Sequence, residues 1–289
     1  MKILAPAKIN LFLEITGKTK TGYHTLNTVF QAVSLYDEIT ITDERHHEID
    51  FTCNWSGVGV SYSSPVEENL CYRAASALKA YLKEKRGAKI KLIKKIPVGA
   101  GLGGGSSDAA AVLRGLLKFW NREIDNNSLN RIAVELGADV PFFLYGGCCF
   151  AEGIGERLFP LRTEWDEKPL NLLLVKPDIS KSSGDIYRAY DKRAANKPAT
   201  INDTSKIKRE KSVSLDNLEF VNNLEGVVFE KYPILETIKT NLKGLEAFVS
   251  LMSGGGTAIF GIFKAESIAK KAFLEIKKSG FNAWLVHTL

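Results

Sequence analysis

The sequence has few of the features that mark exported or disulfide-linked proteins. It holds four cysteines (Cys53, Cys71, Cys148 and Cys149) and no CxxC pair. Adjacent cysteines such as Cys148 and Cys149 have a poor geometry for pairing with each other, so we expect reduced thiols rather than a disulfide framework. Reduced thiols favour a cytoplasmic protein.

Long apolar runs and metal-ligand patterns are also absent. The N-terminal stretch MKILAPAKINLFLEI is broken by Pro6, Lys8 and Asn10, so it is a poor signal sequence, and no later segment reaches transmembrane length. The histidines at positions 46, 47 and 287 lack ligand spacing with cysteine or carboxylate. We therefore expect an unexported protein with no membrane partner and no metal held by the protein alone.

The composition is that of an ordinary globular protein. Hydrophobic residues make up 45% and charged residues 25% of the 289 residues, which is enough chain for two domains. Lysine and arginine (39) exceed aspartate and glutamate (33), giving a net charge of +6. This balance permits an anionic partner, such as a nucleotide, a nucleic acid or a membrane surface, without choosing among them.

The apolar periodicity predicts an α+β protein without internal repeats. Strands are expected over residues 2–15, 32–41, 89–96, 140–147, 170–177, 245–252, 257–263 and 282–289. Helices are expected over residues 67–85, from 106 or 107 to 120, 128–136 and 266–278. We place Asn127 as the cap of the third helix, Gly137 after its end, and Asp139 in a tight turn before a strand.

The pattern loosens near residue 160, where we place a soft boundary between domains 1–160 and 161–289. Residues 191–212 are polar, basic and unpatterned, and we interpret them as an exposed loop or a solvated approach to the next helix, without a site.

The stretch PVGAGLGGGSSDAAA (97–111) is dense in glycine and runs into the predicted helix. A helix start leaves backbone N–H groups unpaired and carries the positive end of the helix dipole, so this pattern favours a site for an anion, most often phosphate. Ser106 and Ser107 add hydroxyl donors. A capped turn without a ligand is the alternative, but it needs only one or two glycines.

Two known phosphate loops were weighed against this stretch. A Walker A loop is excluded because no lysine follows the last glycine. A dinucleotide-binding GxGxxG is satisfied by Gly99, Gly101 and Gly104, with Glu123 near the expected acidic position. Pro97 and the absence of an opening βαβ unit count against that alternative.

The segment PVGAGLGGGSSDAA resembles the second motif of the GHMP kinases, a superfamily named for galactokinase, homoserine, mevalonate and phosphomevalonate kinases. PAKINLFLEITGKTKTGYHTLNTVFQ, LGADVPFFLYGG, AEGIGE and LMSGGGTAIFG are similar, in order, to landmarks of the branch that acts on a cytidine-diphosphate-linked methylerythritol. The SGGGT segment departs from the Ser-Gly-Ser/Thr-Gly of many members. The resemblance implies two α+β domains, a ribosomal-S5-domain-2-like one followed by a ferredoxin-like one, with the active site in the cleft between them.

The resemblance also implies a reaction in the non-mevalonate route to isoprenoid precursors. The γ-phosphoryl group of ATP, which brings its own Mg²⁺, passes to the 2-hydroxyl of the cytidine-linked substrate. Lys8 and Asp139 match the catalytic pair, in which the carboxylate accepts the hydroxyl proton and the ammonium keeps the carboxylate ionised and faces the γ-phosphate. Without the motifs, Lys8 would be an exposed strand lysine and Asp139 a loop residue.

Further site residues follow from the resemblance. Asn10 is expected to bind the methylerythritol part, and Tyr23 and His24 are expected to bind the cytosine. Ser183 is expected to place a hydroxyl near the substrate, and Tyr187 is expected to lie against the cytosine. Glu68-Asn69 matches the adenine side. The nucleotide-binding set is Pro97, Val98, Gly99, Ala100, Gly101, Leu102, Gly103, Gly104, Gly105, Ser106, Ser107 and Asn69. Asp108 is interpreted as support for the helix dipole.

Two other functions stay open at this point. Another GHMP kinase acting on a simpler alcohol is distinguished by the Tyr23-His24 loop. An RNA-binding module would use the basic balance, but the lysines of 83–95 alternate with core residues and carry no interleaved aromatics. We therefore expect a solvated edge strand there and no nucleic-acid partner.

Overall fold

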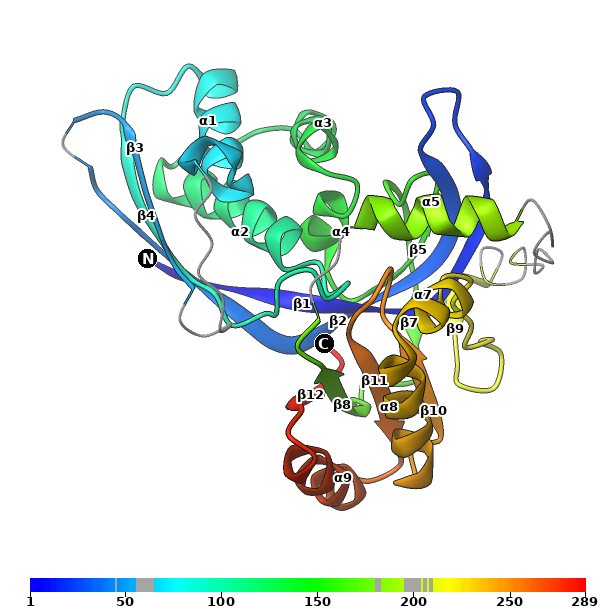
Figure 1. Ribbon diagram of the computed structural model, residues 1–289. Coiled ribbons are helices and arrows are strands. Elements are labelled where there is room, and N and C mark those ends of the chain that lie inside the picture. Colours follow the sequence, from blue (N-terminus) through cyan, green and yellow to red (C-terminus); the bar gives the residue numbers. More distant parts are fainter. Residues whose placement is uncertain (45, 56–64, 180–182, 195–203, 205–206, 208–209) are drawn as a thin grey trace. The chain divides into compact units, whose positions relative to one another are not determined.

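The computed structural model describes residues 1–289 except 45, 56–64, 180–182, 195–203, 205–206 and 208–209 (Figure 1). The chain forms two compact units that alternate along the sequence. Unit 1 comprises Met1–Ala7, Leu35–Val98 and Gly103–Tyr145, and unit 2 comprises Lys8–Ser34, Gly99–Leu102 and Gly146–Leu289. The boundary expected near residue 160 stays a prediction.

Over its described residues, unit 1 combines strands with four α-helices. Its strands are β3 (Ile49–Asn54), β4 (Ala88–Ile93) and parts of two long strands, β1 (Lys2–Lys18) and β2 (His24–Thr42). Residues 2–7 of β1 and 35–42 of β2 belong to this unit. Its helices are α1 (Leu70–Leu82), α2 (Gly104–Phe119), α3 (Asn126–Leu136) and α4 (Val140–Tyr145), with a 3-10 turn at Val66–Glu68. Helices α1 and α2 lie beside each other next to β3 and β4 (Figure 1).

Strand β4 lies inside the sheet of unit 1. It pairs in parallel with β3 and antiparallel with residues 38–42 of β2, so that Ile90 is opposite both Phe51 and Ile41. Its alternating pattern buries Ile90 and exposes Lys89 and Lys91, as the sequence predicts. The expectation of an edge strand is wrong, because β3 covers the side that was expected to be open.

Two helices begin earlier than predicted. Gly103 caps α2 in the left-handed conformation, so the helix starts at Gly104. Asp125, not Asn127, caps α3, and its side chain accepts a hydrogen bond from Ser128 N at 2.9 Å. Both differences have the same cause. The capping residue is the one whose oxygen can reach a free backbone N–H of the first helical turn, and the sequence does not show which of several neighbouring candidates does so.

The strand expected over residues 140–147 is a helix. In α4 the five residues from Val140 to Leu144 are all buried, so they show no amphipathic period that would distinguish a helix from a buried strand. Pro141 is tolerated because the first helical turn needs no partner for its backbone nitrogen. Asp139 therefore lies in the turn between α3 and α4.

Unit 2 contains a four-stranded antiparallel sheet in the order β10-β11-β8-β12. Its strands are β8 (Asn171–Lys176), β10 (Val249–Met252), β11 (Ile259–Phe263) and β12 (Asn282–His287). The helices described in full in unit 2 are α5 (Ser183–Ala194), α7 (Glu225–Lys231), α8 (Pro233–Gly244) and α9 (Glu266–Lys278). Residues 172–175 of β8 are fully buried, and helices α8 and α9 pack on this sheet.

Part of β2 also belongs to unit 2 and continues into a second group of strands there. Residues 28–31 of β2 pair antiparallel with β5 (Cys148–Glu152), which pairs with β6 (Arg157–Pro160). Two short strands, β7 (Arg162–Thr163) and β9 (Ser212–Val213), pair in parallel.

The observed class is α+β, as predicted. Over the described residues the strand pairs are antiparallel except for β3–β4, β7–β9 and one isolated bridge, so the doubly wound sheet of the dinucleotide alternative is wrong. All four cysteines are free, as expected. None of the helices described is long and apolar enough to cross a membrane.

Candidate active site

The first part of the glycine loop packs against a second glycine-rich turn in unit 2. Ser253 Oγ donates to Gly101 O at 2.9 Å, and Ala258 N donates to Ala100 O at 3.0 Å. Gly101 has a φ of +79°, and a Cβ there would lie 2.1 Å from Ser253 O. Only glycine allows the two backbones to come this close.

Lys8 lies beside these two turns. Its backbone N donates to Leu102 O at 3.0 Å, and its buried Nζ donates to Asn10 Oδ1 at 2.7 Å. The amide of Asn10 is held in turn by Thr28 Oγ1, which accepts from Nδ2 at 2.8 Å. The ammonium also lies 4.9 Å from the ring centroid of Phe30. A buried ammonium is stable only with such partners, so the exposed strand lysine considered as an alternative is wrong.

The turn at Gly254 reaches the same cluster. A Cβ on Gly254 would lie 3.2 Å from Asn10 Oδ1 and 3.5 Å from Lys8 Nζ. Asn222, which sequence analysis missed, holds this turn, because its Nδ2 donates to Met252 O and Gly254 O at 2.8 Å each. Nothing in the residue pattern around Asn222 indicates these contacts.

The second part of the glycine loop forms the start of α2 in unit 1. Gly103 has a φ of +69°, and its carbonyl accepts from Ser107 N at 2.9 Å. Ser107 Oγ is buried and finds no hydrogen-bond partner within the described part of the chain. A buried hydroxyl without a partner, at the positive end of a helix, fits a bound phosphate oxygen.

Asp108 is buried beneath this helix start. Its Oδ2 accepts from Lys94 Nζ at 2.6 Å, and Lys94 also pairs with Asp37, so the expected role at the helix dipole is replaced by an interior ion-pair cluster. Burial raises the pKa of Asp108 to about 8 against the opposing charge of Lys94. Burial lowers the pKa of Lys94, but Asp108 and Asp37 raise it more, so it ends above its usual range.

The predicted adenine-side residue Asn69 is the cap of α1, and its side chain accepts from Cys71 N at 2.9 Å. In the same unit, a Cβ on Gly105 would lie 3.4 Å from a side-chain carbon of Leu70. The start of α1 therefore lies next to the start of α2. The nucleotide role of Asn69 stays a prediction.

Asp139 is half-buried in its turn in unit 1, whereas Lys8 belongs to unit 2. The turn is the loop position after Gly137 that the alternative also expects, so the structure does not decide between a catalytic and a purely structural Asp139. Its pairing with Lys8 stays a prediction.

The predicted cytosine residues gather at the hairpin end of β1 and β2, beside α5 (Figure 1). Tyr23 is 65% exposed in the turn, while the His24 ring stacks on Tyr187 with centroids 4.8 Å apart and an interplanar angle of 23°. His24 Nε2 lies 2.7 Å from Asp191 Oδ1. The loop expected from residue 191 is wrong at its start, because Asp191 lies in α5, whereas the absence of a site over 191–212 stays a prediction. Ser183 begins α5, but the structure does not describe its side chain. Most of residues 195–209 also lie outside the described part of the chain.

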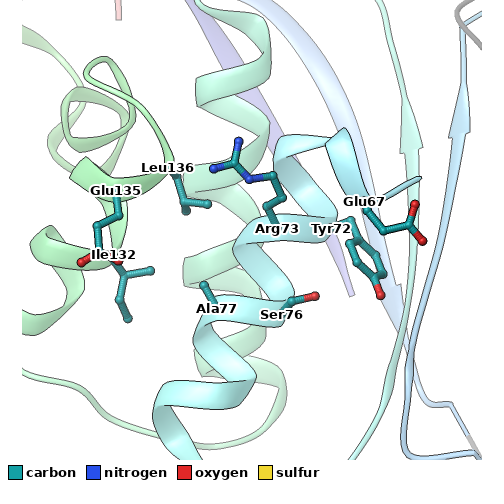
Figure 2. Close-up of a pocket in the computed structure, with 8 residues that line it drawn as sticks. All are labelled: Glu67, Tyr72, Arg73, Ser76, Ala77, Ile132, Glu135 and Leu136. Atoms are coloured by element: carbon teal, nitrogen blue, oxygen red, sulfur yellow. The ribbon is translucent and has the colours of Figure 1, made fainter. Parts of the chain in front are cut away.

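A surface pocket of about 310 Å³ lies between α1 and α3 of unit 1. Figure 2 shows Tyr72 and Arg73 on α1 and Glu135 on α3 among its walls. None of the predicted site residues lines this pocket, so it is not part of the candidate site. Among the described residues there is also no cluster of three or more histidine, cysteine or carboxylate side chains that could hold a metal ion.

The sequence matches the GHMP kinase N-terminal domain over residues 69–147 and the GHMP kinase C-terminal domain over residues 199–282. The fold and the two glycine-rich turns are thus those of a GHMP kinase, an enzyme of the phosphotransferase class. Within this class the chain belongs to the 4-diphosphocytidyl-2-C-methyl-D-erythritol kinase family.

Membership is shown by similarity over the full length. The chain is 39% identical to the kinase of that name from Alkaliphilus oremlandii, over 98% of this chain and 94% of the relative. It is 40% identical to that from Citrifermentans bemidjiense, over 100% and 99%. A solved structure of 4-(cytidine 5'-diphospho)-2C-methyl-D-erythritol kinase matches with a TM-score of 0.81 at 33% identity, covering 100% and 99% of the two chains.

Proposed function

We propose that the protein transfers the γ-phosphoryl group of ATP to the 2-hydroxyl of 4-diphosphocytidyl-2-C-methyl-D-erythritol, giving the 2-phosphate and ADP in the non-mevalonate isoprenoid pathway. The observation that carries the proposal is the cluster in unit 2, where the ammonium of Lys8 lies beside Asn10 and the backbone of two glycine-rich turns. This arrangement combines a buried cation with backbone surfaces that can approach a ligand closely. The free cysteines are consistent with a cytoplasmic enzyme.

The nucleotide binds as Mg-ATP, with its phosphates at the glycine loop and at the start of α2. The unpaired backbone N–H groups of the first helical turn and the hydroxyl of Ser107 donate to phosphate oxygens. Magnesium neutralises charge on the transferred group and enters with the nucleotide.

The chemical step is an in-line phosphoryl transfer. The 2-hydroxyl oxygen forms a bond to the γ-phosphorus while the bond from the γ-phosphorus to the bridging β–γ oxygen breaks and ADP leaves. Asp139 accepts the hydroxyl proton, and Lys8 compensates charge on the carboxylate and on the moving phosphoryl group. Asn10, fixed by Lys8 and Thr28, orients the acceptor alcohol.

The cytidine end is recognised at the β1–β2 hairpin. Tyr23 offers an exposed ring for stacking, and His24 and Tyr187 form a second aromatic wall. Ser183 contributes a hydroxyl from the start of α5. These four residues give the enzyme its requirement for a cytidylylated substrate.

The test is the release of ADP by the purified protein with Mg-ATP and a set of alcohols, with phosphorus NMR of the product. We expect turnover with the cytidine-linked methylerythritol and a 2-phosphate product. Equal turnover of methylerythritol phosphate, which lacks cytidine, would refute the assigned specificity. Steep, salt-dependent RNA binding without ATP binding would refute the kinase function itself.

A further inference from the structure

The imidazole of His24 is held by a carboxylate that belongs to none of the family motifs recognised in the sequence. Asp191 Oδ1 lies 2.7 Å from His24 Nε2, and its other oxygen, Oδ2, accepts from Lys18 Nζ at 2.6 Å. The ring is 9% exposed, stacked on Tyr187 and in edge contact with Tyr190 at 6.2 Å. This surrounding fixes both the position and the orientation of the imidazole.

We propose that Asp191 is a positioning residue that fixes the tautomer of His24. Nδ1 of His24 is then left as a hydrogen-bond acceptor for the exocyclic amine of cytosine, and this contact selects cytosine over uracil. The proposal rests on the proposed function, since it concerns how that same site recognises its substrate.

The carboxylate partner places a proton on Nε2, and the neutral imidazole is the form that the proposal assigns to His24. A carboxylate can only accept hydrogen bonds, so the nitrogen that faces it must carry the proton. Burial raises the pKa of Asp191, but the hydrogen bonds from Lys18 and His24 lower it more, which keeps the group ionised at neutral pH. In a neutral imidazole with hydrogen on Nε2, Nδ1 holds a lone pair. Within the described residues, Nδ1 has no hydrogen-bond partner of its own.

The two pyrimidine bases differ at the group that an acceptor detects. Cytosine carries an amine at C4, which donates, whereas uracil carries a carbonyl oxygen there, which accepts. A lone pair on Nδ1 therefore attracts the cytosine amine and repels the uracil oxygen. The stacked ring of Tyr187 favours a flat ligand but has no preference between the two bases.

The first experiment reads the tautomer directly. Nitrogen-15 NMR of histidine-labelled protein should show His24 with its proton on Nε2. A proton on Nδ1 in the wild-type protein overturns the proposal, whatever the substrate proves to be. This measurement is independent of turnover, so it also separates failure of this proposal from failure of the proposed function.

The second experiment uses Asp191→Asn. An asparagine can accept from Nε2–H through its oxygen or donate to a bare Nε2 through its amide, so both tautomers become possible. The ratio of kcat/KM for the cytidine-linked over the uridine-linked substrate should fall by at least about tenfold, with KM for Mg-ATP unchanged. Asp191→Glu keeps a carboxylate and should retain most of the preference.

Asp185→Asn is the matched control, because Asp185 is an exposed carboxylate on the same helix and pairs with Arg188 instead. It should leave the base preference as in the wild type. An unchanged cytidine-to-uridine ratio in a folded Asp191→Asn variant overturns the proposal, as does an equal loss in Asp185→Asn. Absence of any turnover of the cytidine-linked substrate by the wild type would instead refute the proposed function, while the NMR result stands by itself.

Discussion

Lys94, Asp37 and Asp108 meet in the interior of unit 1, beneath the first turn of α2. Lys94 and Asp108 are 3% and 2% exposed, so these polar groups are stable in the interior only because they hydrogen-bond one another and the Lys94 ammonium also pairs with Asp37. Asp37 Oδ1 also accepts from Ile96 N at 2.8 Å, next to the glycine loop. The cluster ties the end of β4 to the start of α2 and thereby supports the proposed phosphate site.

The raised pKa of Asp108 predicts a pH dependence of stability. Between the ordinary aspartate pKa of about 3.9 and its folded value of about 8, the folded state binds one proton more than the unfolded state. This contribution is complete below the unfolded pKa and is lost as pH rises through the folded pKa, so the free energy of unfolding should decline over this range. Asp108→Asn should flatten the decline, as measured by urea unfolding at about pH 5 and about pH 8.

Neighbouring thiols do not confuse this measurement. Burial raises the pKa of Cys53 to about 12 and that of Cys71 well above its usual value, so neither titrates in the window. Asp185→Asn, at an exposed site, should keep the wild-type slope. Identical slopes for wild type and Asp108→Asn would mean that Asp108 stays ionised in the folded protein.

The proposed catalytic pair gives a second prediction for single residues. Asp139→Asn keeps the shape of the side chain but removes the base, so kcat should fall by about 10²–10⁴ with little change in substrate KM. Lys8→Ala should also depress kcat, and the double variant should lose much less than the sum of the two losses, since the residues act as one unit. Steady-state kinetics with Mg-ATP and the cytidine-linked substrate measure this.

A near-normal kcat in Asp139→Asn together with an inactive Lys8→Ala would change the mechanism. Asp139 would then orient the hydroxyl, and catalysis would rest on positioning and charge neutralisation, as a loose, metaphosphate-like transition state allows.

The two glycine-rich turns contact each other through Gly101 and Ser253. Gly101→Ala introduces a left-handed alanine and also places a Cβ 2.1 Å from Ser253 O. Gly280→Ala is a matched control, since Gly280 has a similar φ of +82° and nothing within 4 Å of its Cβ position. The control should cost about 1–2 kcal/mol of unfolding free energy, and Gly101→Ala about 1–3 kcal/mol more. Equal costs, measured by chemical denaturation, would mean that the turns can separate freely.

Binding of Mg-ATP should raise the free energy of unfolding of the whole protein. Saturating Mg-ATP at 100 times its Kd should stabilise the protein by about 2.7 kcal/mol, seen as a rise in Tm. Gly103→Val should abolish most of this rise, because a branched side chain is strained at a φ of +69° and blocks the approach of phosphate. Stabilisation by the cytidine-linked substrate should persist in the same variant. A normal Mg-ATP shift in folded Gly103→Val would place the triphosphate elsewhere.

Much of the fold could be predicted from local pattern. Helix α9 has the predicted bounds Glu266–Lys278, because its apolar stripe and flanking breaks are visible in the sequence. Helix α4 was missed because an apolar run without a polar face has no readable period. In the candidate site, the glycine loop was predicted from its glycine density before a helix and Lys8 from motif resemblance, whereas Asn222 and Asp191 carry no motif and act through contacts distant in the chain.

The α+β class, the glycine-rich helix start and the family follow from the amino-acid sequence alone, because each depends on residues close together in the chain. Which charges are buried, and what they bind, depends on the tertiary packing. Lys94 stands in a basic run that looks solvated, yet its carboxylate partner Asp37 is 57 residues away. Asp191 reaches His24 across 167 residues. Partners of this kind are selected by packing and by the cost of burying a charge alone, which no local pattern encodes.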